Sequence, residues 1–489
     1  MKWLKDLLYG VSLKAVSGST TVEIGAICFD SRAVGPSDAF VAVRGTATDG
    51  HAYIEAAVKS GARAVICEEL PDDMADGVTY AEVPDSQQAL AVMASNYYGN
   101  PSANLKLVGV TGTNGKTTVS TLLYQLFKKA GYKVGLISTI RILVDEAEYG
   151  TRHTTPDALT INKYLAEMNV AGVEYCFMEV SSHGLAQQRT AGLRFEGAVF
   201  TNLTHDHLDY HKDFAEYRNA KKLLFDGLPR HAFALINADD KNGLFMIQNT
   251  RARKYTYALK SYADFRAQVL EQQMDGQLLK IQDNEVWTKL IGTFNAYNIL
   301  AIYATASLLG LETLEILKLL SGLHSVDGRF QYFVSKQRIT AIVDYAHTPD
   351  ALKNVLITIN ALRTGNENVI TVVKCGGDRD KSKRPVMGHI ASEMSQTAIF
   401  TSDNPRSEPP QAIIDEMKAG VEPQNARKVI SIVDRAEAIR TACRLAAEGD
   451  IILVAGKGHE TYQEIAGVRK DFDDFRMVRN ELETLASKA

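Results

Sequence analysis

The segment with the clearest chemical meaning is G-V-T-G-T-N-G-K-T-T, at positions 109–118. Glycines in such a loop let successive backbone N–H groups turn toward an anion, and a helix that starts there adds its positive dipole. Lys116 can reach the outer phosphates of a nucleotide, and Thr117 can ligate Mg²⁺. The common pattern has a further glycine where this chain has Val110, and we expect Gly112 to supply the flexibility instead. The segment therefore predicts a nucleotide-phosphate loop.

Two further segments carry side chains that suit metal or phosphate chemistry. In Y-C-F-M-E-V-S-S-H-G-L-A-Q-Q-R, which begins at residue 175, Glu179 lies within an otherwise apolar run. Because an unpaired buried carboxylate is costly, a bound Mg²⁺ would relieve that cost. The segment T-H-D-H-L-D-Y-H, at positions 204–211, has three histidines and two aspartates after its threonine. Such density suggests metal or phosphate chemistry.

Other interpretations of these residues explain less of the sequence. Residues 181–183, S-S-H, could suggest a serine hydrolase, but adjacent side chains on extended backbone point apart and the G-x-S-x-G elbow is missing. The H-x-H of residues 205–207 resembles the start of a zinc or binuclear hydrolase site, an alternative that leaves the phosphate loop unexplained. A GTPase switch needs N-K-x-D, and N-K-Y-L at residues 162–165 lacks the aspartate.

Most of the polar segments follow short runs of β-branched and apolar residues. One series of runs lies between residues 105 and 237 and a second between residues 340 and 455, with helical patterns between the runs. This alternation predicts mostly parallel sheets covered by helices. Open α/β sheets bind ligands at the carboxyl edge of their strands, so we expect the polar segments to meet there.

The chain length favours about three domains, at roughly 150 residues per domain. The first hundred residues contain their own strand-like runs, A-F-V-A-V and A-R-A-V-I-C, and end at the turn-forming Y-G-N-P-S. A helical pattern at 294–309 precedes a second boundary near residues 326–331. We therefore predict an α/β protein with domains at residues 1–98, 99–328 and 329–489.

Composition excludes several classes of protein. Apolar residues make up 45% of the 489, and 54 Lys and Arg stand against 58 Asp and Glu, so the net charge of −4 gives no positive field for nucleic acid or anionic membranes. No run approaches the roughly 18 apolar residues of a membrane span, and Asp6 interrupts the region where a secretory signal would be apolar. Five cysteines without a C-x-x-C pair predict neither a disulfide framework nor a thiolate metal site. We expect a cytoplasmic protein.

Seven segments, in order, carry a resemblance to a known family. They are G-T-N-G-K-T-T at 112, E-V-S-S-H-G at 179, T-H-D-H-L-D-Y-H at 204, G-T-F-N-A-Y-N at 292, D-G-R-F at 327, D-Y-A-H-T-P at 344 and G-K-G-H-E at 456. With them the sequence resembles the Mur ligases, ATP-dependent enzymes that add amino acids to a UDP-linked muramoyl precursor. D-S-R-A-V at 30, C-G-G-D-R-D at 375 and D-N-P-R-S-E at 403 resemble the member that adds the third residue of the stem peptide. The resemblance implies a small N-terminal α/β uridine-nucleotide domain, a central P-loop ATPase domain and a C-terminal Rossmann-like domain.

The chemistry implied by the resemblance proceeds through an acyl phosphate. ATP phosphorylates the D-glutamyl γ-carboxylate of UDP-N-acetylmuramoyl-L-alanyl-D-glutamate, and the incoming amine then displaces phosphate. The catalytic residues implied are Lys116, Glu179, His207 and Lys221. The Mg²⁺ ligands implied are Thr117, Glu179, His207 and Lys221 in carbamylated form. Taken alone, Lys221 beside Lys222 in a helical pattern is typical of a solvated helix face.

The resemblance also implies three sets of binding residues. ATP is expected to bind Gly112, Thr113, Asn114, Gly115, Lys116, Thr117, Thr118, Asn295, Asn298, Arg329, Asp344 and His347. The UDP precursor is expected to bind Ser31, Thr46, Ala47, Thr48, His153, Thr154, Thr155, Ser181, Gln187 and Arg189, although relatives often have asparagine in place of His153. The incoming amino acid is expected to bind Arg379, Asp403, Asn404, Pro405, Arg406, Gly456 and Glu460.

Arg406 indicates which amino acid is added. Its planar guanidinium suits bidentate pairing with a carboxylate, and meso-diaminopimelate has a carboxylate at its far end where lysine has none. An L-lysine-adding ligase and a folylpolyglutamate synthetase-like ligase remain alternatives, and Arg406 could instead brace the loop against Glu408. We expect a monomer that uses Mg²⁺ and ATP, binds the UDP-muramoyl dipeptide and meso-diaminopimelate, and binds neither nucleic acid nor membrane.

Overall fold

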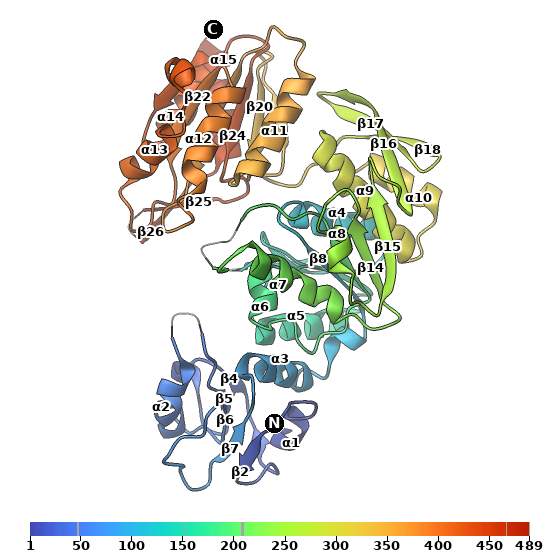
Figure 1. Ribbon diagram of the computed structural model, residues 1–489, viewed down its shortest axis with the longest axis vertical. Helices are drawn as coiled ribbons and strands as arrows, with labels where there is room; N and C mark the ends of the chain where they lie inside the picture. Colours follow the sequence, from blue (N-terminus) through green and yellow to red (C-terminus); the bar gives the residue numbers. More distant parts are fainter. Residues whose placement is uncertain (46–47, 152, 207–209, 466, 489) are drawn as a thin grey trace.

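The computed structural model describes residues 1–45, 48–151, 153–206, 210–465 and 467–488. Thr46, Ala47 and His207, three of the predicted site residues, lie outside the described residues. The chain forms three α/β units that follow one another along the long axis of the molecule, from the N-terminal unit at one end to the C-terminal unit at the other (Figure 1). This arrangement confirms the predicted three-domain α/β architecture.

The N-terminal unit is built on a five-stranded sheet. Its strand order is β2 (Ala15–Ser17), β7 (Thr79–Glu82), β6 (Ala64–Cys67), β5 (Ala39–Val41) and β4 (Ile27–Cys28), with β2 antiparallel to a parallel set. The helices are α1 (Leu4–Leu7), α2 (Ile54–Lys59) and α3 (Ser86–Tyr97), and β1 (Lys2–Trp3) pairs with β3 (Glu23–Ile24). Every residue of β5 and β6 is buried, which is why these runs are almost wholly apolar.

The central unit contains an eleven-stranded sheet with a parallel middle. The parallel strands are β9 (Val134–Ile137), β12 (Tyr175–Glu179), β8 (Lys106–Thr111), β13 (Gly197–Phe200), β14 (Phe233–Asn237) and β15 (Arg253–Ala258). At one edge lie β10 (Ile142–Val144) and β11 (Ala147–Tyr149), and at the other lie β16 (Phe265–Gln273), β17 (Gly276–Ile281) and β18 (Asn284–Thr288). Strand β16 pairs parallel with β15, and β17 and β18 continue from it as an antiparallel meander that the sequence did not predict.

Helices cover both faces of the central sheet. They are α4 (Lys116–Lys129), α5 (Ala158–Ala171), α6 (Ser182–Ala186), α7 (Phe214–Asp226), α8 (Gly243–Met246), α9 (Thr293–Leu308) and α10 (Thr313–Ser321). One core joins α4, α9 and α10 to the sheet, and a second joins α5 and α7 to its other face. Helix α9 is apolar around most of its circumference because it lies inside this layer.

Strand register sets the positions of the polar residues in the central unit. Glu179, the last residue of β12, lies opposite Val110 of β8. On the other side of β8, Phe200 of β13 lies opposite Thr111. The carboxyl ends of three neighbouring parallel strands therefore meet at the phosphate loop, as the sequence predicted.

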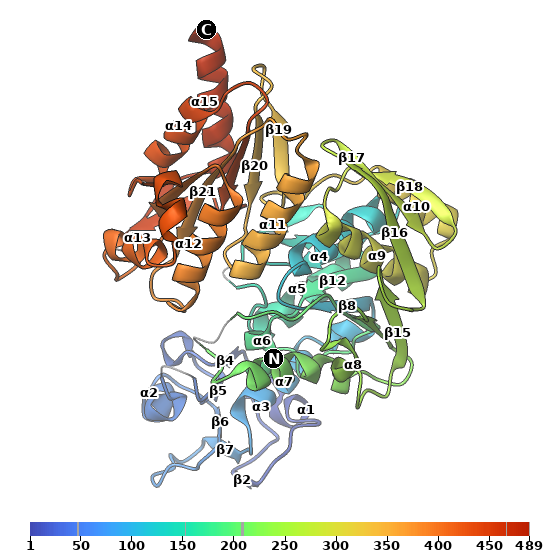
Figure 2. The same cartoon turned by 45° about the horizontal axis from the view of Figure 1, so that its top comes forward.

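The C-terminal unit has a six-stranded sheet. The strand order is β19 (Gln331–Val334), β20 (Thr340–Asp344), β24 (Ile451–Ala455), β21 (Val369–Cys375), β22 (Thr397–Ser402) and β23 (Val429–Ser431), with β19 antiparallel. Its helices are α11 (Pro349–Leu362), α12 (Lys383–Met394), α13 (Pro410–Lys418), α14 (Arg435–Leu445) and α15 (Asp474–Lys488), and β25 (Tyr462–Ile465) pairs with β26 (Val468–Asp471). Figure 2 shows α11 beside the central unit.

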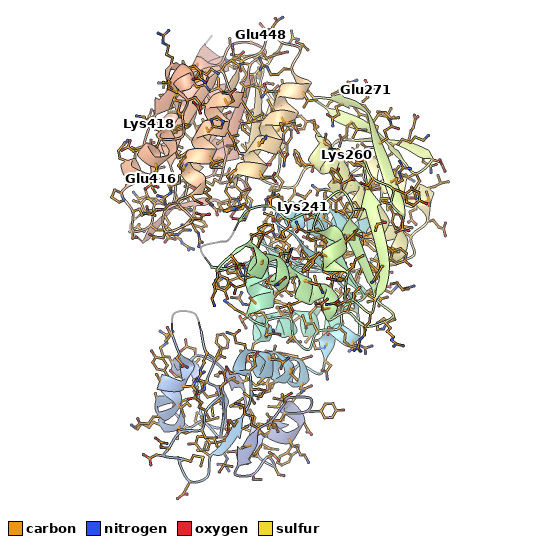
Figure 3. The ribbon with its side chains drawn as sticks, viewed as in Figure 1. Lys241, Lys260, Glu271, Glu416, Lys418 and Glu448 are labelled. Atoms are coloured by element: carbon orange, nitrogen blue, oxygen red, sulfur yellow. The ribbon has the colours of Figure 1, made fainter. Side chains whose placement is uncertain are left out.

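The surface carries charges of both signs. Exposed Lys241, Lys260 and Lys418 are interspersed with exposed Glu271 and Glu448, as Figure 3 shows. In the part of the chain that the structure describes, no helix is both long enough and apolar enough to cross a lipid bilayer.

Candidate active site

The loop between β8 and α4 has the geometry of a phosphate-binding loop. Gly112 has φ +150° and Gly115 has φ +87°, and a Cβ atom on Gly112 would lie 1.9 Å from the Thr201 hydroxyl oxygen. A Cβ on Gly115 would lie 2.6 Å from Oδ1 of Asn298. No side chain caps the N-terminus of α4, so its first N–H groups remain available to an anion. Gly112 therefore takes the role that Val110 cannot fill.

Lys116 lies across this loop. Its Nζ donates to the carbonyl oxygens of Gly112, at 2.9 Å, and Thr113, at 2.8 Å. Burial lowers the pKa of the Lys116 ammonium, while the nearby Glu179 carboxylate opposes that shift. The side chain is therefore held at the mouth of the loop by weak carbonyl partners that a phosphate can replace.

Glu179 is fully buried and accepts three hydrogen bonds. Its Oε2 accepts from the hydroxyls of Thr117 and Thr139, each at 3.0 Å, and its Oε1 accepts from the Thr139 N–H at 2.8 Å. Hydroxyl and carboxylate oxygens are the donors that Mg²⁺ prefers. Thr117 and Glu179 thus fit a magnesium ion. Among the described residues, no three histidine, cysteine or acidic side chains form a metal-binding group.

Lys221 is buried, contrary to the solvated helix face that its neighbourhood suggested. It is 1% exposed on α7, and its Nζ donates to the Gly112 carbonyl oxygen at 2.9 Å. Burial lowers its pKa far below the usual value, and the charge of Lys116 adds to this shift. Lys222 is buried too and pairs with Asp226 at 2.5 Å. The solvated-face interpretation was wrong because Lys221 packs against the phosphate loop and Lys222 packs near the Phe245 ring.

The C-terminal unit contacts the phosphate loop through two side chains. Nη2 of Arg329 donates to the Thr117 hydroxyl at 3.0 Å, and Nδ2 of Asn114 donates to Oδ2 of Asp350 at 3.1 Å. Arg329 therefore lies at the phosphate end of the loop. The contacts place the phosphate loop at the junction of the central and C-terminal units.

Asp344 and His347 lie at the same junction and are held by backbone groups. Asp344 accepts from the N–H groups of Phe330, at 2.6 Å, and Ala346, at 2.7 Å. Burial raises the pKa of Asp344, and Arg329 opposes this. Burial also lowers the pKa of His347 to about 4, which keeps the imidazole neutral near neutral pH.

Two cavities meet at Lys116. The smaller cavity is lined by residues of the phosphate loop and of both domains, including Thr113, Asn114, Gly115, Lys116, Thr117, Thr118, Glu179, Asn295, Asn298, Arg329, Asp344 and His347. The larger cavity is lined by Lys116, His153, Thr154, Thr155, Ser181, Gln187, Arg189, Lys221, Arg379, Asn404, Arg406, Gly456 and Glu460, among others. The structure thus brings the predicted ATP residues together, and it places most residues of the other two sets around one shared space.

The central wall of the larger cavity is a chain of hydrogen bonds. Nε and Nη2 of Arg189 donate to Oε1 of Gln187 at 3.0 and 2.6 Å, and the Gln187 amide donates to the Tyr210 hydroxyl at 3.1 Å. The Ser181 hydroxyl accepts from the Gly184 N–H at 3.1 Å as the cap of α6, and Ser182 is buried. A serine nucleophile gains no support from this geometry.

The opposite wall is the segment after β22. Oδ1 of Asn404 accepts from the Glu464 N–H at 2.7 Å, and Nδ2 of Asn404 donates to Oε2 of Glu460 at 3.4 Å. Arg406 donates to the Gly377 carbonyl oxygen and forms no ion pair among the described residues. Arg406 lines the larger cavity, where its guanidinium can pair with a carboxylate.

Arg406 does not brace the loop against Glu408. That carboxylate accepts two hydrogen bonds of 2.8 Å from the buried Arg384 and lies 3.2 Å from Nζ of Lys381. The bracing interpretation was therefore wrong, since Arg384 already performs that role.

Several predicted residues lie away from both cavities. Ser31 begins a short 3-10 helix in the N-terminal unit, and the exposed Thr48 lies in the same unit; neither lines the smaller or the larger cavity. Asp403 is fully buried behind the cavity wall, and Pro405 does not line it either. Of the residues that we predicted for the amino acid, Asn404 and Arg406 are the ones from this loop that reach the cavity.

Three further residues of the site were not predicted from the sequence. Thr139, two residues after β9, and Asp206, in the histidine-rich segment, line the smaller cavity. Asp350, the second residue of α11, contacts the phosphate loop through Asn114. Their positions after strands were a usable signal, because ligands bind at strand ends. Threonine and aspartate are too common there to single out without the fold.

The phosphate loop lies in a cavity at the junction of two α/β domains. This cavity meets a second one, whose walls carry cationic and amide side chains. An ATP-dependent ligase has this arrangement. Family models match the chain three times: "Mur ligase family, catalytic domain" at residues 23–98, "Mur ligase middle domain" at 110–306 and "Mur ligase, glutamate ligase domain" at 328–458. The chain belongs to the Mur ligase family.

Named relatives cover nearly the whole chain. It is 56% identical over 483 residues to the UDP-N-acetylmuramoyl-L-alanyl-D-glutamate–2,6-diaminopimelate ligase of Cytophaga hutchinsonii, covering 99% of each chain. It is 54% identical over 477 residues to the ligase of the same name from Phocaeicola vulgatus, covering 98% of this chain and 99% of the relative. A solved structure of a ligase of that name matches with 32% identity, a TM-score of 0.69 and 99% coverage of both chains. A folylpolyglutamate synthase from Mycobacterium tuberculosis, at 16% identity and a TM-score of 0.62 over 82% of this chain and 94% of its own, shares the fold.

Proposed function

We propose that this chain is an ATP-dependent ligase that joins meso-diaminopimelate to UDP-N-acetylmuramoyl-L-alanyl-D-glutamate. The observation that supports this best is the shared position of Lys116, which lines both the nucleotide cavity and the larger cavity. The Lys116 ammonium can therefore stay close to a phosphoryl group while that group is transferred from ATP to a carboxylate. The names of the relatives, at more than half identity over the whole chain, support the same substrates.

The proposed reaction has two steps. An oxygen of the D-glutamyl γ-carboxylate attacks the γ-phosphorus of ATP, the bond to the β,γ-bridging oxygen breaks, and ADP leaves. The uncharged amine of the amino acid then attacks the acyl carbon, loses a proton, and displaces inorganic phosphate. Both steps gather negative charge on phosphoryl oxygens, which Lys116 and the N–H groups at the start of α4 stabilise.

Mg²⁺ fits this site through the oxygens of Thr117 and Glu179, with His207 as a further ligand outside the described residues. When bound, the ion neutralises phosphate charge. Lys221 is proposed to be carbamylated, because burial beside Lys116 favours its uncharged amine, which can add to CO₂ with loss of a proton. The modification would replace a charge that repels Mg²⁺ with one that attracts it.

The precursor is proposed to extend from the N-terminal unit to the central wall. Its uridine diphosphate end would contact Ser31 and residues 46–48, and its peptide end would contact His153, Thr154, Thr155, Ser181, Gln187 and Arg189. Arg189 supports this role, because it fixes the Gln187 amide and itself presents a cation suited to a diphosphate or carboxylate.

The far end of meso-diaminopimelate is proposed to lie between Arg406 and Glu460. Arg406 would pair with the carboxylate and Glu460 with the ammonium, with Asn404, Arg379 and Gly456 beside them. L-lysine would leave the Arg406 guanidinium without a carboxylate. Folylpolyglutamate synthesis is the weaker alternative, since the likeness to that enzyme is one of fold alone.

The proposal includes the domain limits 1–98, 99–328 and 329–489, a monomeric enzyme, and a cytoplasmic location, where ATP is available. The deciding experiment is a phosphate-release assay with ATP, Mg²⁺ and the UDP-muramoyl dipeptide, in which amino acids are offered one at a time. We expect meso-diaminopimelate to give rapid phosphate release and L-lysine almost none. Equal use of both, or release without the dipeptide, would overturn the proposal.

A further inference from the structure

A buried group of charges lies directly behind the Asn404–Arg406 wall. Asp403 is fully buried, and its two carboxylate oxygens face different lysines: Oδ2 lies 3.1 Å from Nζ of Lys374, and Oδ1 lies 3.3 Å from Nζ of Lys457. Lys457 is itself fully buried. Two buried ammonium groups therefore share one carboxylate.

Lys457 also contacts the second segment of the wall, which follows β24. Its Nζ donates to the Tyr462 carbonyl oxygen and lies 3.8 Å from Oε2 of Glu460. The same ammonium lies 5.4 Å from the centre of the Tyr462 ring and 5.9 Å from that of Phe472. Lys457 is thus the link between Asp403, which precedes Asn404, and Glu460.

The charges of this group do not balance without Glu460. The ammonium groups of Lys374 and Lys457 carry two positive charges, and the Asp403 carboxylate carries one negative charge. One positive charge is therefore in excess. The neighbouring buried pair of Arg435 and Asp474, at 2.7 Å, is neutral by itself. Burial lowers the pKa of the Lys457 ammonium, and Asp403 and Glu460 oppose that shift.

An incoming ammonium that pairs with Glu460 draws this carboxylate away from the excess charge. The buried positive charge then favours a substrate that brings its own carboxylate into the neighbouring cavity, beside Arg406 and Glu460. An amino acid whose far end carries both an ammonium and a carboxylate satisfies both groups, whereas a far end with an ammonium alone satisfies one.

We propose that Lys457 is a positioning and specificity-determining residue of the amino-acid site. It fixes the Asp403–Asn404 segment relative to Glu460, and it supplies the buried charge that selects an amino acid with a zwitterionic far end. The inference rests on the proposed function and adds to it a residue that is hidden from the substrate.

The test compares Lys457→Met with Lys374→Met in the full-length enzyme. Both variants remove one ammonium from Asp403, but, among the described residues, Lys457 lies within ion-pair distance of Glu460 and Lys374 forms neither an ion pair nor a hydrogen bond with it. For Lys457→Met we expect the KM for meso-diaminopimelate to rise at least about tenfold and its preference over L-lysine to fall by a similar factor. The KM values for ATP and the UDP-muramoyl dipeptide should stay within about twofold. Lys374→Met should raise the KM for meso-diaminopimelate less and keep more of the preference.

A folded Lys457→Met enzyme with the parent KM and preference would overturn the inference. Should that variant fail to fold, Lys457→Gln removes the same charge but keeps an amide donor for the Tyr462 carbonyl oxygen, and it leaves Asp403 paired with Lys374. We expect the same rise in KM from it, because Glu460 still lacks its partner, and a parent KM there would also overturn the inference. Failure of the proposed function is distinguishable, because the parent enzyme would then not use meso-diaminopimelate at all.

Discussion

Lys116 and Lys221 donate to the same carbonyl oxygen, that of Gly112, each at 2.9 Å. One lysine comes from the loop itself and the other from α7, more than a hundred residues later in the chain. Two ammonium groups at one oxygen repel each other, and this repulsion adds to burial in lowering the pKa of Lys221. The proposed function assigns them different roles: Lys116 is the cation that binds phosphate, and Lys221 is the amine that loses a proton on carbamylation.

Lys116→Ala should abolish ligation. The phosphoryl group would lose its closest cation in a buried site, which corresponds to a fall in kcat of about a hundredfold to a thousandfold or more. The measurement is phosphate release, with circular dichroism to show an intact fold. Substantial activity in the folded variant would contradict the assignment, and exposed Lys241→Ala is the matched control.

Lys221→Ala should be poorly active, and a small added carboxylate should restore part of the activity by supplying the missing anion. The modification itself is tested with ¹³C-labelled bicarbonate, which should give a carbamate carbon signal in the parent enzyme. That signal should persist in Lys222→Ala and vanish in Lys221→Ala. A parent enzyme that is active but carries an unmodified Lys221 would reject carbamylation.

Stability should fall as the pH drops from about 6.5 toward 4. Burial lowers the pKa of His347 to about 4, whereas an unfolded histidine titrates near 6.5, so the unfolded state binds the extra proton between these values. The stability is fully present above the unfolded pKa. His347→Asn should lose less stability in urea melts over this window, and exposed His231→Asn should follow the parent curve. An unchanged pH slope in His347→Asn would refute the account.

ATP and the UDP-muramoyl dipeptide together should favour the arrangement in which the C-terminal unit contacts the phosphate loop. Arg329 and Asp350 supply the contacts, at 3.0 and 3.1 Å from Thr117 and Asn114. Small-angle X-ray scattering should show a smaller radius of gyration with both ligands than with neither. Arg329→Ala should weaken this compaction and raise the KM for ATP. Ligand-independent scattering curves would argue against closure.

Arg406→Ala should lose activity with meso-diaminopimelate without a change in ATP binding. Discrimination against L-lysine rests on a guanidinium left without its carboxylate and should reach about a thousandfold in the parent enzyme. Arg406→Lys keeps the charge but not the planar fork, so it should recover only part of the activity. The ratio of kcat/KM values for the two amino acids is the measurement. An unchanged ratio in Arg406→Ala would contradict the role.

Local features of the fold could be predicted from the sequence, and long-range features could not. The strand–loop–helix around Gly112 was predictable because the glycines, the apolar strand and the helical spacing are adjacent. The burial of Lys221 was not, because it depends on a loop far away in sequence. The meander β16–β18 was missed because its first strand is largely exposed and lacks a clear apolar alternation. The role of Arg384 was missed because arginine is usually exposed in proteins. Its burial becomes evident only when the fold brings Glu408 beside it.

Asn404 and Arg406 both have left-handed backbone conformations, with φ of +49° and +51°, on either side of Pro405. A non-glycine residue pays roughly 1–2 kcal/mol for that conformation. Glycine at position 406 would relieve the strain but remove the guanidinium that faces the cavity. Thermal stability therefore favours glycine at position 406, whereas discrimination between amino acids favours arginine. A laboratory selection for thermostability alone would be free to discard Arg406, so a more robust descendant of this enzyme could lose its discrimination between amino acids.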